Sequence, residues 1–178
     1  MNILTRHIYR DHVIVGGVVA LIAMPFGDYF SSLLFWLSSV LIDVDHWFVL
    51  VYRTKFRFWN ARSLMRFHEL IFERRNATEF LGIDIFHTLE FVGLLGITAF
   101  AKIHILQPVF YGVIFHCFID VIHLTRYDVF NKRCHSLVEY GWRRKKLFAQ
   151  GRNPDLVFQE AFEALCIQQD SRRSRSGA

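Results

Sequence analysis

Residues 29–52 read YFSSLLFWLSSVLIDVDHWFVLVY, and they decide how the whole chain is interpreted. The stretch has no charged residue through Ile42 and is apolar or small on every side. A soluble helix normally keeps a polar face, whereas a bilayer-spanning helix needs about 20 predominantly apolar residues. Asp43, Asp45 and His46 then follow, although ionisable groups are costly in hydrocarbon. The stretch therefore predicts a membrane helix whose polar end has a function.

Three more apolar stretches surround it, at 12–27, 84–101 and 104–124. Each is about as long as a helix that crosses a bilayer. Of the 178 residues, 53% are hydrophobic, which excludes disorder for most of the chain. We predict an all-α fold, an integral membrane bundle of about four transmembrane helices. A soluble all-α protein with buried core helices is the alternative.

The positive charges follow a topological pattern. Of the 21 Lys and Arg residues, two precede the first apolar stretch, seven lie between the second and third, and eleven follow the fourth. Cytoplasmic loops carry an excess of such residues. The pattern predicts a multi-pass protein of the cell inner membrane with both termini cytoplasmic. Because it also accounts for the net charge of +5, no specific nucleic-acid partner is expected.

The chain divides into three predicted segments. We expect a membrane-embedded, metal-binding helical domain at 1–126, a cytoplasmic helical extension at 127–169, and a disordered tail at 170–178. Residues 60–75 separate apolar and charged side chains with a helical period, which predicts an amphipathic helix in the membrane interface. A helix packed on the protein core is the alternative for this segment.

The ionisable residues within the apolar stretches are histidines and carboxylates, with no Lys or Arg among them. Each costs about 2.5–3.5 kcal/mol on insertion scales, so something must compensate. Imidazole and carboxylate together suit a divalent cation. With both termini inside, four sets of these residues reach one level near the cytoplasmic interface. We therefore predict metal ligands at His12, Asp43, Asp45, His46, His87, His116 and Asp120.

Helical spacing predicts how the side chains in two of these groups are oriented. Asp84, His87 and Glu90 recur every three residues, which predicts one shared face at the start of a helix over 84–101. On a continuous helix, Asp45 points nearly opposite to Asp43. Either that helix ends or unwinds near Asp43, or Asp45 is not a ligand.

The order of the motifs resembles the membrane-bound metal-dependent hydrolase family, the LexA-regulated inner-membrane hydrolases. The matching residues are His12 ahead of Gly16-Gly17, Ile42-Asp43-Val44-Asp45-His46, His87-Thr88-Leu89-Glu90, and His116 four residues before Asp120. The resemblance covers roughly residues 10–125. By the family's distant similarity to zinc-dependent phospholipases C, it implies phosphoester cleavage. Ile42 stands where the family usually has Pro.

The residues and the resemblance together predict a membrane-embedded, metal-dependent hydrolase that acts on a phosphoester. Seven ligands suit one or two divalent ions, most simply zinc. Glu90 or His123 is the candidate general base or ligand-orienting residue. His68 lies on the apolar face of the predicted amphipathic helix and could reach the site. A site at headgroup depth beside basic loops predicts a membrane lipid or a lipid-linked phosphate as substrate.

A non-catalytic function is the main alternative. In that case the His/Asp cluster of an integral membrane protein binds a structural metal, or it locks the helices together through a polar network. A metal or proton transporter is disfavoured, because the polar residues occupy only one half of the predicted membrane depth.

Overall fold

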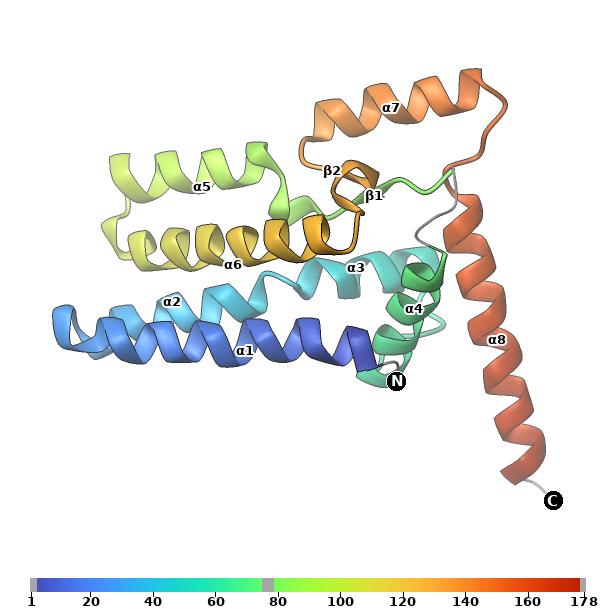
Figure 1. The fold of residues 1–178 in the computed structure, drawn as a ribbon, viewed down its shortest axis with the longest axis horizontal. Coiled ribbons are helices and arrows are strands. Elements are labelled where there is room, and N and C mark those ends of the chain that lie inside the picture. The colour runs from blue at the N-terminus through green and yellow to red at the C-terminus, as the bar shows by residue number, and fades with distance from the viewer. Residues whose placement is uncertain (1–2, 75–78, 177–178) are drawn as a thin grey trace.

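The chain forms an elongated helical bundle with further helices gathered at one end (Figure 1). The structure, a computed structural model, describes residues 3–74 and 79–176. Its helices are α1 (Ile3–Ala23), α2 (Tyr29–Leu41), α3 (Val44–Arg53), α4 (Ala61–Glu73), α5 (Leu89–Ala101), α6 (Gln107–Arg126), α7 (Leu137–Ala149) and α8 (Leu156–Ser176). Two short strands, β1 (Gly82–Ile83) and β2 (Arg133–Cys134), pair in parallel. The all-α prediction is confirmed for the described residues.

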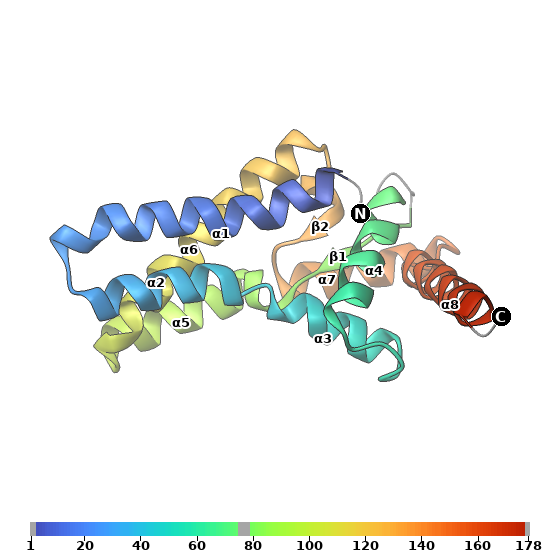
Figure 2. The same ribbon diagram turned by 90° about the horizontal axis from the view of Figure 1, so that it is seen from below.

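Helices α1, α2, α5 and α6 form the elongated part, as both ribbon views show (Figures 1 and 2). α2 packs on α6 and on α1, and α5 packs on α6. Small residues allow the close approach: a Cβ atom at Gly112 of α6 would overlap Ser38 Oγ and the carbonyl oxygen of Phe35 in α2. A Cβ atom at Gly16 of α1 would lie 2.7 Å from Ser39 Oγ. Both glycines therefore set the spacing between helices near the site.

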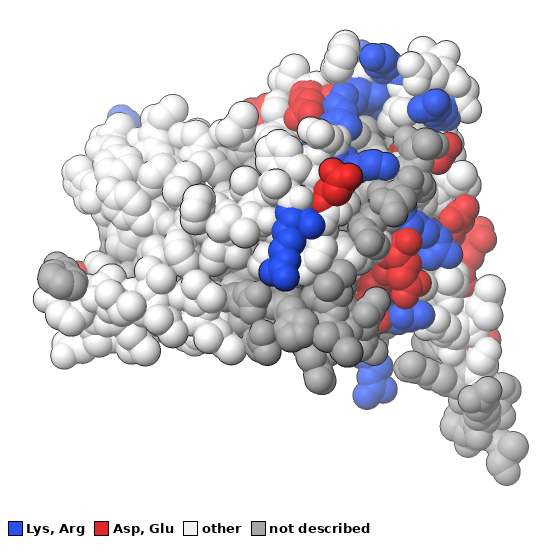
Figure 3. Space-filling model, viewed as in Figure 1, with Lys and Arg blue, Asp and Glu red and all other residues white. Residues whose placement is uncertain are grey.

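Within the described residues, two helical stretches are long and apolar enough to cross a membrane, Tyr29–Arg53 and His104–Arg126. Only 28% and 22% of their most apolar segments are buried within the chain, so most of that apolar surface is left uncovered. The apolar helices His12–Ala23 and Leu89–Ala101 are shorter. On the face in Figure 3, the bundle end far from α8 is almost free of charged side chains. A bundle of four membrane spans stays a prediction.

The helix predicted over 29–52 breaks at its polar motif. α2 ends at Leu41, α3 begins at Val44, and Asp43 lies between them with φ −65° and ψ 0°. This confirms the prediction that the helix ends or unwinds near Asp43. Because of the break, the side chains of Asp43 and Asp45 need not point in opposite directions, as they would on a continuous helix.

The prediction of a helix from Asp84 onward is wrong. Asp84 is extended, with φ −121° and ψ 117°, and Ile85–His87 form a single 3-10 turn. α5 begins only at Leu89, because the Thr88 side chain caps it by accepting a hydrogen bond from the N–H of Phe91. Asp84 and His87 therefore reach the site from an irregular segment that directly follows β1.

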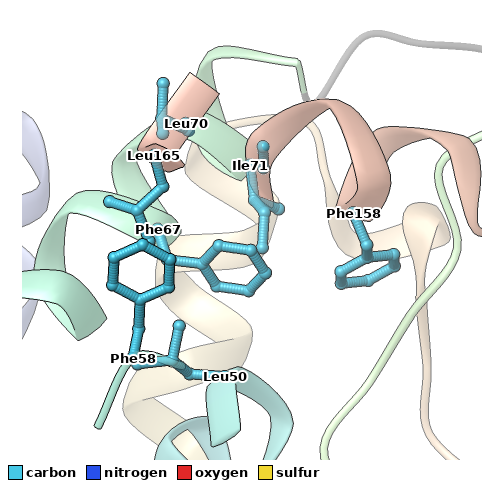
Figure 4. Close-up of a cluster of buried hydrophobic side chains, with 8 residues drawn as sticks. Leu50, Phe58, Phe67, Leu70, Ile71, Phe158 and Leu165 are labelled. Carbon is cyan, nitrogen blue, oxygen red and sulfur yellow. The ribbon is translucent and has the colours of Figure 1, made fainter. Parts of the chain in front are cut away.

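α4 is amphipathic as predicted, but its apolar face is covered by protein. Figure 4 shows side chains of α4 against those of α3 and α8. The buried cluster comprises Leu50, Phe58, Phe67, Leu70, Ile71, Phe158, Ala161 and Leu165. Arg74, directly after α4, also pairs with Glu160 of α8 at 3.0 Å. The expected interfacial position is therefore corrected: α8 takes the apolar surface that lipid would otherwise cover.

The C-terminal segment contains more helix than its composition predicted. α8 continues through Ser176, whereas disorder was expected from residue 170, and residues 177–178 lie outside the described part of the chain. Gln and Arg are good helix formers, and no Gly or Pro interrupts the sequence before Gly177. A helix that has already started can therefore extend through this polar stretch at little cost.

Candidate metal centre

The seven predicted metal ligands lie together at one end of the bundle. They come from α1, the junction of α2 and α3, the turn before α5, and α6. Their ligand atoms form three groups, and within each group all the atoms lie within 4.8 Å of one another. The groups are His12, His116 and Asp120; Asp43, His87 and His116; and Asp45, His46 and Asp84. The described residues thus bring every sequence-predicted ligand into contact with the cluster, and they add Asp84.

Oδ1 of Asp43 is the centre of the first arrangement. The Nε2 atoms of His46, His87 and His116 lie 3.4, 3.6 and 3.3 Å from it. Ligand atoms about 2.0–2.1 Å from one tetrahedral zinc ion lie about 3.3 Å from one another. The ligand atoms of Asp43, His87 and His116 also lie within 4.8 Å of one another, so these three groups could share an ion.

Asp120 is the centre of the second arrangement. Its Oδ1 lies 3.2 Å from Nε2 of His12 and 3.7 Å from Nε2 of His116. Its Oδ2 lies 3.6 Å from Nε2 of His87. His87 and His116 thus face both carboxylates, and the donor set has room for one or two ions.

The other ring nitrogens fix how these imidazoles are protonated. Two of them have a hydrogen-bond acceptor at Nδ1: His116 has the carbonyl oxygen of Ser39 at 2.6 Å, and His87 has the Asp45 carboxylate at 3.0 Å. Since a carbonyl or carboxylate oxygen only accepts, a neutral imidazole at either position donates from Nδ1 and keeps the Nε2 lone pair. Nδ1 of His46 lies 2.8 Å from Asp84 Oδ1 without hydrogen-bond geometry.

Lone pairs and carboxylate oxygens therefore face one another around Asp43. Nε2 of His87 and Nε2 of His116 are buried and have no hydrogen-bond partner. Two acceptors at this separation repel each other unless a proton or a cation lies between them. A divalent cation would satisfy Asp43, His87 and His116 at once, because their ligand atoms all lie within 4.8 Å of one another, so the residues present fit a metal.

Asp45 lies on the far side of His87 from Asp43. Its Oδ2 accepts from Nδ1 of His87 and also from the N–H of Phe86 at 3.1 Å. Oδ1 of Asp84 lies 2.8 Å from Nδ1 of His46, an ion-pair contact without hydrogen-bond geometry. A carboxylate behind a ligating histidine orients the ring and raises its basicity. Asp45 and Asp84 are thus placed to support ligands.

A cavity of about 190 Å³ opens beside the cluster. Its polar wall contains His12, Asp43, His46, Asp84, Asp120 and Arg133. Its apolar wall contains Ile71, Phe72, Phe80, Leu124, Tyr127 and Val129. The space suits a small polar group with an apolar attachment.

Two further histidines line this cavity. The ring of His68, on α4, lies 4.7 Å from the ring of His46. Burial, together with the neighbouring His46, lowers the pKa of His68 to about 3, so its imidazole is neutral. His123, on α6, lies edge-on to His12 with ring centres 5.5 Å apart. The expectation that His68 could reach the site is met.

Glu90, in contrast, lies away from the cluster. Its carboxylate accepts hydrogen bonds from Ser136 Oγ at 2.5 Å and from the N–H of Leu137 at 3.1 Å. Those groups form the start of α7, where a negative charge is stabilising. The assignment of Glu90 as a general base is therefore withdrawn, because late onset of α5 turns its side chain toward α7.

Arg133 is the residue that the sequence analysis missed. Its Nη1 lies 2.6 Å from Asp120 Oδ2 and its Nη2 lies 3.1 Å from Asp84 Oδ2. Burial alone would lower its pKa, but the carboxylates of Asp84 and Asp120 raise the pKa of Arg133 above its usual range. Arg133 is brought here by pairing with Gly82 across the β1–β2 bridge. In the sequence it is one of eleven basic residues after the last apolar stretch, with nothing to single it out.

Comparison with known proteins adds no relative: no family model, curated protein or solved structure matches the chain. The resemblance to the metal-dependent hydrolases stays a prediction carried by short motifs. Support for the site comes from its geometry.

Proposed function

We propose that this chain is a membrane-embedded, metal-dependent hydrolase that cleaves a phosphoester. The observation that carries the proposal is the arrangement around Asp43, where three imidazole Nε2 atoms lie 3.3–3.6 Å from one carboxylate oxygen. His12, His46, His87, His116, Asp43 and Asp120 would hold one or two divalent cations, with zinc the simplest choice. Asp45 and Asp84 would support the histidines.

The adjoining cavity supports catalysis over a purely structural role. Structural zinc sites are closed by protein ligands, whereas catalytic sites keep a position open. Here Asp43, His46 and Asp120 border a cavity of about 190 Å³. A divalent cation bound there would supply Lewis-acid activation of water and of the phosphoester oxygens.

His123 is the candidate general base in this proposal. Its ring lines the cavity beside His12, outside the three groups of ligand atoms. An imidazole at the cavity wall can accept a proton from attacking water and return it to the leaving oxygen. The neutral ring of His68, on another wall, is a second group that the substrate would meet.

The cavity and the outer surface together support an amphiphilic substrate, a membrane lipid or a lipid-linked phosphate. The polar wall would take the phosphate, and Phe72, Phe80 and Leu124 offer apolar surface to the attached chain. Charged side chains gather at the end of the molecule that holds α3, α4, α7 and α8 (Figure 3). We propose that this end faces the cytoplasm and that the uncharged end lies in the inner membrane.

The test is metal content and turnover of detergent-purified protein. Wild type should retain divalent metal and hydrolyse members of a phosphoester panel, such as p-nitrophenyl phosphate and phosphatidic acid in mixed micelles, and chelation should abolish turnover. His116→Gln should lose metal and at least about 100-fold of the rate. His104→Gln is the matched control, because exposed His104 lies before the start of α6, contacts Gln107 and belongs to none of the three groups of ligand atoms.

The alternative outcomes are distinct. A wild-type protein that retains no divalent metal, or whose turnover survives chelation, contradicts the proposal. Metal retained without turnover of any panel member favours the non-catalytic alternative, a structural ion that locks the helices. Equal losses in His104→Gln and His116→Gln would show a general effect of removing histidine.

A further inference from the structure

Arg133 faces the same cavity as the metal-binding groups, yet it is not itself a possible metal ligand. Its side chain is 11% exposed and lines the polar wall. A guanidinium has five N–H donors in a planar fork. Each Nη atom contacts a single carboxylate oxygen, and the contact of Nη2 with Asp84 lacks hydrogen-bond geometry. Donors therefore remain for a further acceptor.

The two aspartates beside Arg133 contact both the guanidinium and the imidazoles. In each of them Oδ2 faces Arg133 and Oδ1 faces a histidine, His12 for Asp120 and His46 for Asp84. Oδ2 of Asp120 also lies 3.6 Å from Nε2 of His87. The same carboxylates thus fix the position of the guanidinium and of the imidazoles. An anion held by the guanidinium would lie next to whatever the imidazoles hold.

The net charge of the cluster indicates which kind of ligand would bind beside Arg133. With neutral imidazoles, Asp43, Asp45, Asp84 and Asp120 against Arg133 give the cluster a formal charge of −3. Two divalent cations would change that charge to +1. A site of that charge, with a forked donor on its wall, favours a phosphate group over a neutral or cationic one.

We propose, resting on the proposed function, that Arg133 is the substrate-binding residue that holds the phosphoryl oxygens beside the metal-binding histidines. The substrate class is then a phosphate with free equatorial oxygens on an apolar leaving group. The guanidinium forms two parallel hydrogen bonds to those oxygens. The β1–β2 bridge and the bonds from Ser136 and Leu137 to Glu90 keep the Arg133 segment against the segment that carries Asp84 and His87.

The experiment uses inorganic phosphate as the probe and needs no turnover. Purified wild type, Arg133→Gln, Arg133→Lys and Arg143→Gln are metal-loaded, freed of excess metal and titrated by calorimetry, with bound metal measured on the same samples. Arg143, on α7, is the matched control, since it pairs with Glu139 and donates to the carbonyl oxygen of Asn131 and does not line this cavity.

Arg133→Gln should keep its metal and bind phosphate about 10- to 100-fold more weakly than wild type, as expected when charged hydrogen bonds are lost. Arg133→Lys should be intermediate, because Lys keeps the charge but lacks the fork. Arg143→Gln should bind phosphate like wild type. If the Gln variant does not fold, the Lys variant decides, and wild-type affinity in it overturns the inference.

Wild-type phosphate affinity in Arg133→Gln also overturns the inference. The inference is also overturned if Arg133→Gln loses part of its metal but its metal-loaded molecules bind phosphate with wild-type affinity. Arg133 would then only position the aspartates. Failure of the proposed function is seen separately, as wild type without metal or without turnover. If no metal binds, the titration is repeated on metal-free wild type and Arg133→Gln, and equal phosphate binding overturns the inference.

Discussion

Nδ1 of His87 lies 3.0 Å from Oδ2 of Asp45, so this carboxylate lies behind the imidazole. Asp43, two residues earlier, faces the opposite nitrogen of the same ring at 3.6 Å. The break between α2 and α3 makes this possible, because it lets neighbouring aspartates approach His87 from two sides. In the proposed metal centre, one motif would thus supply both a metal ligand and the support for a second ligand.

The first prediction separates the two aspartates. Asp43→Asn should lose bound metal on gel filtration, because the carboxylate shared by three imidazoles is gone. Asp45→Asn should keep metal with affinity about 10- to 100-fold weaker, the usual cost of removing a supporting carboxylate. Competition with a chromogenic chelator measures both. Equal affinities in the two variants would contradict the different roles.

The second prediction concerns thermal stability. A cation that binds only the folded chain raises the free energy of unfolding by about 2.7 kcal/mol when its concentration is 100 times Kd. Chelation of wild type should therefore lower Tm in detergent, and metal should restore it. His116→Gln should show a low Tm that neither treatment changes. An unchanged Tm in wild type would argue against a metal that bridges helices.

The third prediction tests helix packing near the site. Gly112→Ala forces a Cβ atom into Ser38 and the backbone of Phe35, so α2 and α6 must separate. We expect a loss of about 1–3 kcal/mol in unfolding free energy, measured by denaturation in detergent, together with weaker metal binding. Gly93→Ala in α5 is the control: no atom lies within 4 Å, so stability should be unchanged or about 0.5–1 kcal/mol higher.

The fourth prediction tests orientation in the membrane. In a variant with Cys117, Cys134 and Cys166 replaced by Ser, a single cysteine is placed at Lys102 or at Lys145. A membrane-impermeant maleimide should label Lys102→Cys in intact spheroplasts and Lys145→Cys only after permeabilisation, since Lys102 follows α5 and Lys145 lies in α7. The reverse pattern would place the metal centre on the outer side.

The fifth prediction uses the buried thiol of β2. Burial raises the pKa of Cys134 from 9.0 to about 11. Because the thiolate is the reactive form, alkylation at pH 8 should be about 100-fold slower than in the unfolded chain and should accelerate as pH rises. A variant with Cys134 as the single cysteine, alkylated with and without denaturant, measures this. Equal rates would show that the β1–β2 bridge is open.

Local patterns in the sequence predicted the helices and the gathering of the ligands. Apolar stretches located α1, α2, α5 and α6, and the placement of Lys and Arg led to a common level for the histidines and aspartates. Their convergence follows from alternating helix direction, which needs no side-chain detail. The helical angle between the side chains of Asp43 and Asp45 left two alternatives: a break near Asp43, or no ligand role for Asp45. The break is the one that the structure contains.

The parts that failed depend on contacts between distant segments. Three-residue spacing favoured a helix at Asp84, but the Thr88 cap and the pairing of Gly82 with Arg133 determine that segment. A bridge of two residues on each side leaves no periodic signal. Likewise, the apolar face of α4 does not reveal whether lipid or α8 will cover it.

A fragment that ended at Arg126 would keep every histidine and aspartate of the cluster and lack its one paired guanidinium among the described residues. Such a minimal bundle would concentrate four negative groups in an apolar surrounding with nothing fixed to balance them. The segment after α6 is therefore an integral part of the centre. A shortened chain for expression should extend well beyond Cys134. It should also retain α7, because Glu90 anchors the start of that helix.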